Sequence, residues 1–437
     1  MAARIQEEDA EILRLAVPAF LALVAEPLFL LADSAIVGHL GTRQLAGLGI
    51  AGAILSTLIS LCIFLAYGTT ASVARRIGAG DLRGALAQGV DGIWLAVAIG
   101  MVTTGLGVPL TPWLVGLFGS GEDVADQAAT YLRIGVLGAV PLLVMLACTG
   151  VLRGLQDTRT PLLVAVVGNV ANVVLNLWLV YGLDLGIAGS ALGTVVAQCA
   201  SAAALLVVVT RAARRHGARL RPSLVGVRGA GSAGIPLLLR TVTLRASLLV
   251  MTYGATTLGD RDLAAMQVAM TLWTFLAFAL DAIAIAAQAI TGRYLGAGDH
   301  DGTRAITRRM VRWGVVGGVA TGVLLAAGSP WLGALFTADR QVRDLLVPVL
   351  LVAALTQPLA GVVFVLDGVL IGAGDGRYLA WVGLLVLVVF APAAWLAVGY
   401  AGTLVWLWVA FAVAFMGGRG VVLLTRARTD AWMRLGV

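Results

Sequence analysis

The sequence predicts an all-α integral membrane protein with twelve transmembrane helices in two pseudo-symmetric six-helix bundles around a central cleft. Three observations lead to this fold class: the composition, the number of long apolar runs, and an internal repeat. Of the 437 residues, 60% are hydrophobic and 12% are charged, whereas a typical globular protein has about 25% charged residues. So few charges cannot cover a water-exposed surface, which excludes a soluble enzyme and a disordered protein.

Long apolar runs follow one another along the whole chain. A helix rises about 1.5 Å per residue, so about 20 apolar residues cross the hydrocarbon core of a bilayer. The first run contains Pro18 and Pro27, which predict a kink or tilt in that helix. The twelve runs that predict spans lie near residues 12–38, 45–74, 85–110, 124–152, 160–182, 187–210, 230–257, 263–292, 305–329, 342–371, 378–400 and 402–425.

The basic residues indicate which connections face the cytoplasm. All 30 are arginine, and the net charge is +7. With the N-terminus inside, 23 arginines fall on that side, from Arg211 and Arg214 of the central connection to Arg419 near the end, and four fall on the other. This bias predicts a multi-pass protein of the cytoplasmic (inner) membrane with both termini in the cytoplasm. It also explains the positive charge without a nucleic-acid partner.

The chain lacks the usual sequence signals of metal or cofactor chemistry. Cys62, Cys148 and Cys199 lie inside apolar runs without CxxC spacing, so neither a disulfide framework nor a metal site is expected. No HExxH, nucleophile elbow or Walker loop is present. We therefore expect no cofactor, and an ion gradient rather than ATP as the energy source.

The second half of the sequence repeats the first at an offset of 218 residues. The segment LGTRQLAGLGIA from Leu40 corresponds to LGDRDLAAMQVA from Leu258, and residues 40–84 and 258–302 share 15 identities in 45 ungapped positions. Because each repeat contains an even number of helices, both copies enter the membrane from the same side. The expected domains are an N-terminal lobe (1–210), a cytoplasmic linker (211–229) and a C-terminal lobe (230–437). Two such lobes suit alternating access.

Ionisable residues at membrane depth are functional candidates because burying a charge there costs several kcal/mol. Glu26 and Asp33 are seven residues apart and share one face of the first helix. Amide and hydroxyl side chains of the fifth and sixth runs would complete a polar pocket in which a carboxylate takes and releases protons. The alternative is that these side chains only form hydrogen bonds between helices, as such groups often do in membrane proteins. They are Asn169, Asn172, Asn176, Thr194 and Gln198.

The second half has a different balance of buried charge. Asp281 and Asp367 can be offset by Arg240 and Arg245, so the uncompensated negative charge is expected in the first half. The two arginines are five residues apart and point about 140° from each other on a helix, so at most one lines the cleft. These four residues are candidates for a C-lobe site.

Three GAGD segments need separate consideration, because GxGD also occurs in intramembrane aspartyl proteases. They lie at 78–81, 296–299 and 372–375, each beside an arginine at a predicted cytoplasmic helix end. Glycine permits positive φ and aspartate accepts backbone hydrogen bonds, so the segments predict turns. A protease role for Asp81 is the less favoured interpretation.

Five segments together resemble the multidrug and toxic compound extrusion (MATE) transporters, in their DinF-like branch, over essentially the whole chain. They are EPLFLLADSAIVGHLGTRQLAGLGIA, RRIGAGD, VLRGLQDTRTP, GNVANVVLNLWLVYGLDLGIAGSALGTVVAQ and FVLDGVLIGAGDGRYLA. The resemblance implies a MATE-like fold and cation-coupled antiport of hydrophobic, usually cationic compounds. It also implies a coupling site at Asp33, Asn172, Asn176 and Thr194. Some relatives carry an acid where this chain has Asn176, so Glu26 is expected to substitute, which favours protons over sodium.

The sequence thus predicts a monomeric, proton-coupled multidrug exporter that is not an enzyme and whose partners are small hydrophobic or cationic substrates and the lipid bilayer. The alternative is a flippase for lipids or polyprenyl-linked saccharides, because related superfamilies share twelve helices in two bundles. Phosphate-bearing substrates require several free cationic residues in the cleft, and only Arg240 or Arg245 could serve.

Overall fold

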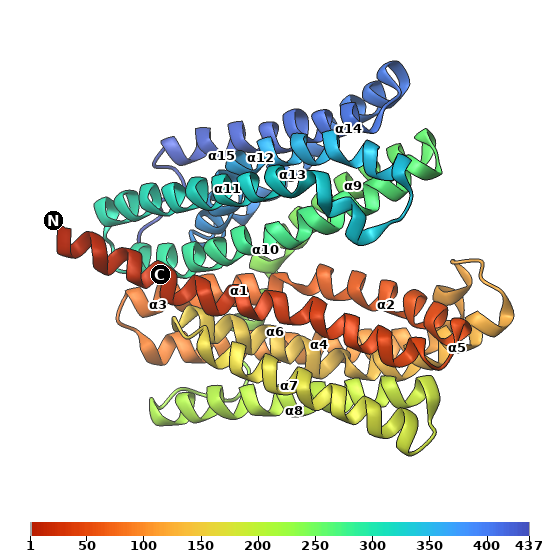
Figure 1. The fold of residues 1–437 in the computed structure, drawn as a ribbon. Helices are drawn as coiled ribbons and strands as arrows, with labels where there is room; N and C mark the ends of the chain where they lie inside the picture. The colour runs from red at the N-terminus through yellow and green to blue at the C-terminus, as the bar shows by residue number, and fades with distance from the viewer. Residues whose placement is uncertain (1, 437) are drawn as a thin grey trace. The chain divides into compact units, whose positions relative to one another are not determined.

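The computed structural model describes residues 2–436, and the side chains of residues 7–436 (Figure 1). All regular secondary structure in this range is helical. Twelve helical segments within residues 7–428 are long and apolar enough to cross a membrane, which confirms the predicted number of spans. Some spans contain a break: α2 (Thr42–Cys62) and α3 (Phe64–Gly78) form one span that is interrupted at Ile63.

The chain divides into two compact units. Residues 21–234 form the N-terminal unit, and residues up to 20 together with those from 235 onward form the C-terminal unit. The units differ from the expected lobes because two helices are shared: α1 (Ala2–Gly38) begins in the C-terminal unit, and α9 (Leu224–Leu258) begins in the N-terminal unit. Each helix continues in the other unit.

The N-terminal unit contains the second part of α1, the start of α9 and the helices between them. These are α2, α3, α4 (Leu82–Gly116), α5 (Glu122–Gly135), η1 (Val136–Gly138), α6 (Ala139–Gly154), α7 (Arg159–Leu177), the π-helical η2 (Trp178–Gly182) and α8 (Gly186–Arg215). In this unit α6 packs against α3, α4 and α8, and α7 packs against α8.

The C-terminal unit repeats this order of elements after α9. It contains α10 (Asp260–Gly296), α11 (His300–Phe336), α12 (Arg340–Gly372), α13 (Gly376–Leu396), the π-helical η3 (Ala397–Ala401), α14 (Leu404–Ala410), the π-helical η4 (Phe411–Gly417) and α15 (Gly418–Arg428). Here α12 packs against both α10 and α11.

Equivalent glycines bring equivalent helices together in the two units. A Cβ on Gly150 would lie 2.6 Å from the carbonyl oxygen of Ala66, and one on Gly368 would lie 2.3 Å from that of Ala284. Both residues of the second contact lie 218 positions after those of the first. The helices therefore approach closely enough for backbone to meet backbone, as is usual between membrane helices with small residues at the contact.

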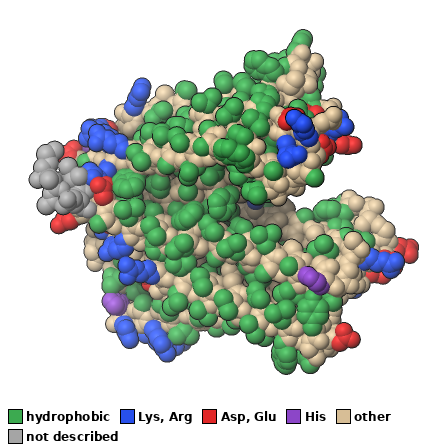
Figure 2. All heavy atoms as spheres, in the orientation of Figure 1, with side chains coloured by type: hydrophobic (Ala, Val, Ile, Leu, Met, Phe, Trp, Pro, Cys, Tyr) green, Lys and Arg blue, Asp and Glu red, His purple; other side chains and the backbone are tan. Residues whose placement is uncertain are grey.

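The surface matches a helix bundle that is surrounded by lipid. In Figure 2 hydrophobic side chains cover most of the visible helical surface of each unit, and charged side chains gather toward the helix ends. Large apolar side chains such as Leu31, Leu163, Leu324 and Trp381 are more than 60% exposed. Exposed apolar side chains on this scale need an apolar surrounding.

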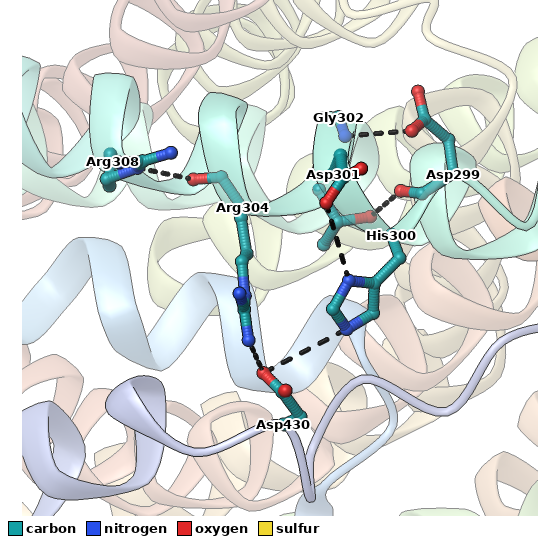
Figure 3. Close-up of polar contacts among 8 residues, drawn as sticks. Asp299, His300, Asp301, Gly302, Arg304, Arg308 and Asp430 are labelled. Carbon is teal, nitrogen blue, oxygen red and sulfur yellow. Dashed lines mark hydrogen bonds and ion pairs between the residues drawn. The ribbon is translucent and has the colours of Figure 1, made fainter.

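The GAGD segments form turns, as predicted. Gly80, Gly298 and Gly374 have positive φ, where a side chain would be strained. Asp299 caps α11 by accepting a hydrogen bond from the backbone N–H of Gly302, as Figure 3 shows. The same figure shows Arg304 and His300 beside Asp430. These charged contacts hold the segment after α15 against the start of α11.

Candidate functional site

The centre of the candidate site is the carboxylate of Asp33, on the part of α1 that belongs to the N-terminal unit. Asp33 is 3% exposed. Its Oδ1 accepts hydrogen bonds from Asn176 Nδ2 at 2.8 Å and from Ser190 Oγ at 2.6 Å, and its Oδ2 accepts one from the Tyr131 hydroxyl at 3.3 Å. The donors come from α7, α8 and α5, so three helices converge on one carboxylate.

No cationic side chain among residues 7–436 neutralises this carboxylate. Among residues 7–436, no arginine or histidine forms an ion pair with Asp33. Neutral hydrogen-bond donors offset part of the cost of burying its charge, but they leave the net charge in place. A proton or a small cation from outside the protein is therefore the natural partner of Asp33.

Two amide oxygens of α7 are available as hydrogen-bond acceptors. Asn172 donates from Nδ2 to Thr194 Oγ1 at 3.4 Å, one helical turn before Asn176. The amide oxygens Oδ1 of Asn172 and Asn176 are both buried and have no hydrogen-bond partner within the described part of the chain. Buried acceptors are normally satisfied. These two oxygens could accept a hydrogen bond from a protonated carboxyl group or contribute ligands to a bound cation.

Gly193 on α8 makes room for this arrangement. A Cβ at this position would lie 2.1 Å from Asn176 Oδ1. The contact lets α7 and α8 approach closely enough for Asn176 and Ser190 to reach the same Asp33 oxygen. A single glycine therefore sets the spacing of the site.

Glu26 lies outside this network. Its side chain is on the exposed surface of α1, and no hydrogen bond or ion pair links it to Asp33 among the residues with described side chains. Asn169 donates to the carbonyl oxygen of Ala25 at 3.4 Å, which joins α7 to α1 as an interhelical contact. Gln198 lies against Gly138 at the junction of α5 and α6. The structure thus brings together four of the expected site residues: Asp33, Asn176, Asn172 and Thr194. Glu26, Asn169 and Gln198 lie outside this network.

Two members of the site were missed from the sequence. Ser190 lies four residues before Thr194 on the same face of α8, so the spacing that singled out Thr194 and Gln198 could have found it. Tyr131 is 5% exposed and lies in a run with several other polar residues near it, namely Asp126, Gln127, Thr130 and Arg133. No periodic signal indicated Tyr131, because its role depends on the packing of α5 beside α8.

The equivalent positions of the C-terminal unit are apolar. Adding 218 to each site position gives Met251, Val349, Phe390, Ala394, Trp408 and Ala412, of which the first five are at most 2% exposed. Phe411 contacts both Phe390 and Trp408 there, with ring centroids 6.2 and 5.5 Å apart. The duplicated fold therefore carries the polar site in one unit and a packed hydrophobic cluster in the other.

Most of the charged candidate residues of the C-terminal unit interact with oppositely charged side chains of the same unit. Arg240 on α9 forms an ion pair with Asp367 on α12, and Arg419 on α15 approaches the same carboxylate at 3.3 Å. Asp281 interacts electrostatically with Arg419, and Arg245 is exposed on α9. The expectation that Arg419 lies in a connection is wrong: it lies within the last span and its side chain is 8% exposed, because Asp367 compensates its burial.

Comparison with known proteins identifies the family. The MatE family model matches the chain twice, at residues 18–178 and 236–396. The two matches start 218 residues apart, as the internal repeat does. The chain belongs to the MATE family. The DNA damage-inducible protein F of Escherichia coli (strain K12) is 33% identical over 373 residues, which cover 84% of this chain and 81% of that protein.

Further MATE relatives agree with this assignment. The probable multidrug resistance protein NorM of Thermotoga maritima is 24% identical over 375 residues, covering 84% of this chain and 80% of that protein. A solved MATE structure in the bent conformation has a TM-score of 0.90 at 22% identity, covering 97% of this chain and 96% of that one. The fold is thus the MATE transporter fold, and the protein is a multi-pass membrane transporter.

Membership in the MATE family also answers the question of an enzymatic role, because its members are transporters and not enzymes. The aspartates of the GAGD segments are accounted for by structure. Asp81 caps α4 by accepting a hydrogen bond from Gly84 N at 2.7 Å, and Arg76 lies 3.0 Å from its carboxylate. The Gly84 N–H and the Arg76 guanidinium hold the pKa of Asp81 below its usual range.

Proposed function

We propose that this MATE transporter exports hydrophobic, cationic organic compounds in exchange for protons, by alternating access across the cytoplasmic membrane. The observation that carries the proposal is the buried Asp33 carboxylate, which accepts three hydrogen bonds and has no ion-pair partner in the described part of the chain. The names of its relatives, multidrug resistance proteins among them, support the drug-export part. One chain with twelve spans would work as a monomer, with both termini in the cytoplasm.

The coupling step follows from the charge of Asp33. The ionised carboxylate favours a nearby positive charge, whether a proton or a cationic substrate, and binding of one removes the attraction for the other. Protonation changes Asp33 from an acceptor into a donor. Asn176 and Asn172 offer buried amide oxygens for that donor. The hydrogen bonds between α1 and α7 would rearrange, and α1 would shift at Pro27.

The choice of protons over sodium rests on the ligands available. Sodium binds best to several oxygen ligands that include negative charge. Within the Asp33 network only one ligand is charged, since Asn176 is neutral and Glu26 lies elsewhere on α1. A proton needs a single carboxylate and one acceptor, both of which the network contains.

The decisive experiment is efflux from proteoliposomes with a fluorescent cationic dye. Asp33→Asn keeps the size and most of the hydrogen bonds of the side chain but removes the titratable charge. We expect a pH gradient to drive efflux in the wild type and to lose at least about 90% of its effect in Asp33→Asn, while the variant remains folded by size-exclusion chromatography.

Glu26→Gln on the same helix is the matched control, because Glu26 makes no contact with the network. It should retain most of the activity. Gradients of pH and sodium are imposed separately with each protein. Proton-driven efflux that persists in Asp33→Asn contradicts the assignment of Asp33, and efflux driven by sodium alone contradicts the assignment of the ion.

A further inference from the structure

Two helices connect the units and must transmit any motion between them. α1 begins in the C-terminal unit and passes into the N-terminal unit after residue 20, and α9 begins in the N-terminal unit and leaves it after residue 234. The changes fall beside Pro18 and Pro236, which are 218 positions apart. Proline removes a backbone hydrogen bond from a helix, so both transitions lie where bending is easiest. How firmly each helix start is held therefore matters.

The start of α9 is held by a buried carboxylate. Asp91 on α4 is 1% exposed and accepts hydrogen bonds from Arg219 Nη2 at 2.6 Å and from the backbone N–H of Ser223 at 2.9 Å. Gly226, in the first turn of α9, lies so close that a Cβ would be 1.9 Å from Asp91 Oδ2. Trp94 adds a hydrogen bond to the carbonyl oxygen of Leu220 at 3.0 Å. We call this contact the α9 clamp.

The carboxylate that holds the start of α1 is more accessible than Asp91, although Arg219 of the α9 clamp is itself 45% exposed. Asp9 forms two hydrogen bonds with the guanidinium group of Arg309 on α11 and accepts a third from Trp313 Nε1 at 2.8 Å. Glu11 pairs with Arg293 on α10 at 2.8 Å. The side chains of Asp9 and Arg309 are 32% and 17% exposed. We call the contact of Asp9 with Arg309 and Trp313 the α1 contact.

The two contacts occupy equivalent places in the duplicated fold. Asp91 is the tenth residue of α4 and Arg309 is the tenth residue of α11, 218 positions later. Each receives the start of a helix that continues in the other unit. The polarity is reversed, because the receiving residue is an acid in one unit and a base in the other. In both units the equivalent position thus contacts the start of a helix that continues in the other unit, once through a carboxylate and once through a guanidinium group.

The difference in burial gives the two contacts different strengths. Separating Arg219 and the Ser223 N–H from Asp91 would leave an ionised carboxylate buried without partners, which is strongly unfavourable. Asp9 and Arg309 are both partly exposed, so water can reach them, and accessible ion pairs contribute little net stability. Glu8 of the same turn lies 3.9 Å from Arg309 and would separate from it together with Asp9. Because Asp91 is the more deeply buried carboxylate, we expect the α1 contact to open at a smaller cost than the α9 clamp.

We propose that the α1 contact is a latch that opens and closes during the transport cycle, while the α9 clamp stays closed throughout. This proposal rests on the proposed transport function, because it assumes that the units move. Asp33 lies 24 residues after Asp9 on the same helix, so one element joins the coupling site to the latch, with Pro18 and Pro27 between them as the places where it can bend. The C-terminal unit would be released from the start of α1 while the N-terminal unit keeps the start of α9.

The test is a distance measurement between spin labels in the full chain, reconstituted in nanodiscs after Cys62, Cys148 and Cys199 are replaced by alanine. Labels at Ala10 and Ala305, both exposed, report on the latch, and labels at Arg83 and Val225 report on the clamp. We expect two populations for the latch pair and one for the clamp pair. Asp9→Asn should raise the ratio of long to short latch distances about two- to fivefold, the range for loss of a partly exposed ion pair.

The controls separate the latch from general damage. Arg308→Ala removes a neighbouring exposed arginine of α11 whose guanidinium group donates to the backbone carbonyl oxygen of Arg304, and it should leave the ratio unchanged. The charge exchange Asp9→Arg with Arg309→Asp should restore the short distance. A single short latch distance in both the wild type and Asp9→Asn, or lengthening of both label pairs together, would overturn the proposal. Because the readout is a distance and not efflux, its failure is distinguishable from persistence of transport in Asp33→Asn.

Discussion

At the scale of single residues, the carboxylate of Asp33 has no ionic partner among the described side chains, and three neutral hydrogen-bond donors stabilise its charge. The shortest of its hydrogen bonds, at 2.6 Å, comes from Ser190 Oγ. Hydrogen bonds to a charged group contribute about 1.5–3 kcal/mol each. These donors stabilise the ionised carboxylate, and the buried amide oxygens of Asn172 and Asn176 are available to accept a hydrogen bond.

Ser190→Ala tests whether the hydrogen bond from Ser190 controls the pH dependence of efflux. Loss of the hydroxyl removes one of the three donors to the carboxylate, and a donor stabilises the ionised form more than the protonated one. The pH of half-maximal efflux should rise by about one to two units, because one unit corresponds to about 1.4 kcal/mol. Efflux rates measured across a pH series give the midpoint directly.

Ser201→Ala is the control for that measurement. Ser201 is also buried on α8 but lies against Gly168 rather than Asp33. Its substitution should not move the midpoint. Equal shifts in the two variants would mean that the packing of α8, and not the hydrogen bond, controls the pH profile.

The same scale shows why part of the site was predictable. Asp33, Asn172, Asn176 and Thr194 are polar residues at helical spacing in apolar runs, a pattern that sequence alone displays. Tyr131 has no such pattern, and its contact with Asp33 arises from the way α5 packs. The exposure of Glu26 was equally hidden, because a spacing of seven gives a shared helix face but not the direction in which each side chain turns.

At the scale of elements, close packing between glycine-bearing helices organises each unit. α11 and α12 meet at Gly314 and Gly361, where a Cβ on Gly361 would lie 1.9 Å from the carbonyl oxygen of Gly314. The twelve spans could be predicted because an apolar run of sufficient length is required to cross a bilayer. The π-helical segments η2, η3 and η4 could not, because they depend on how neighbouring helices pack.

Gly361→Ala should destabilise the C-terminal unit. The new methyl group would meet backbone, which cannot move aside as a flexible side chain can, and overpacking of this kind costs about 1–3 kcal/mol. The melting temperature in detergent should fall by several degrees. Gly105 on α4 has no atom within 4 Å of the place that an added Cβ would take, so Gly105→Ala should leave the melting temperature unchanged or slightly higher. A fall of equal size in both variants would argue against the contact as the cause.

At the scale of the whole molecule, duplication has produced two units with the same helix order and different interiors. The sequence displays the repeat openly, in the spacing of 218 and in the paired GAGD segments. It also indicates that the uncompensated acid lies in the first half, because the second half carries arginines that can offset its aspartates. It does not display which arginine pairs with which aspartate, because the partners lie far apart in the chain. Asp367 and Arg240 are separated by 127 positions, and Arg419 reaches the same carboxylate from α15.

The two buried aspartates should therefore respond in opposite ways to the same substitution. Asp33→Asn removes a charge that has no ionic partner in the described structure, so stability should stay the same or rise while proton-driven efflux is lost. Asp367→Asn leaves Arg240 and Arg419 buried beside a neutral amide. Breaking a buried ion pair in this way costs about 3–5 kcal/mol, so the variant should melt at a clearly lower temperature. Thermal unfolding in detergent and efflux from proteoliposomes, measured on both variants, separate a coupling residue from a structural one. If Asp367→Asn were as stable as the wild type, the carboxylate would not be committed to the arginines, and the C-terminal unit would be open to a coupling role of its own.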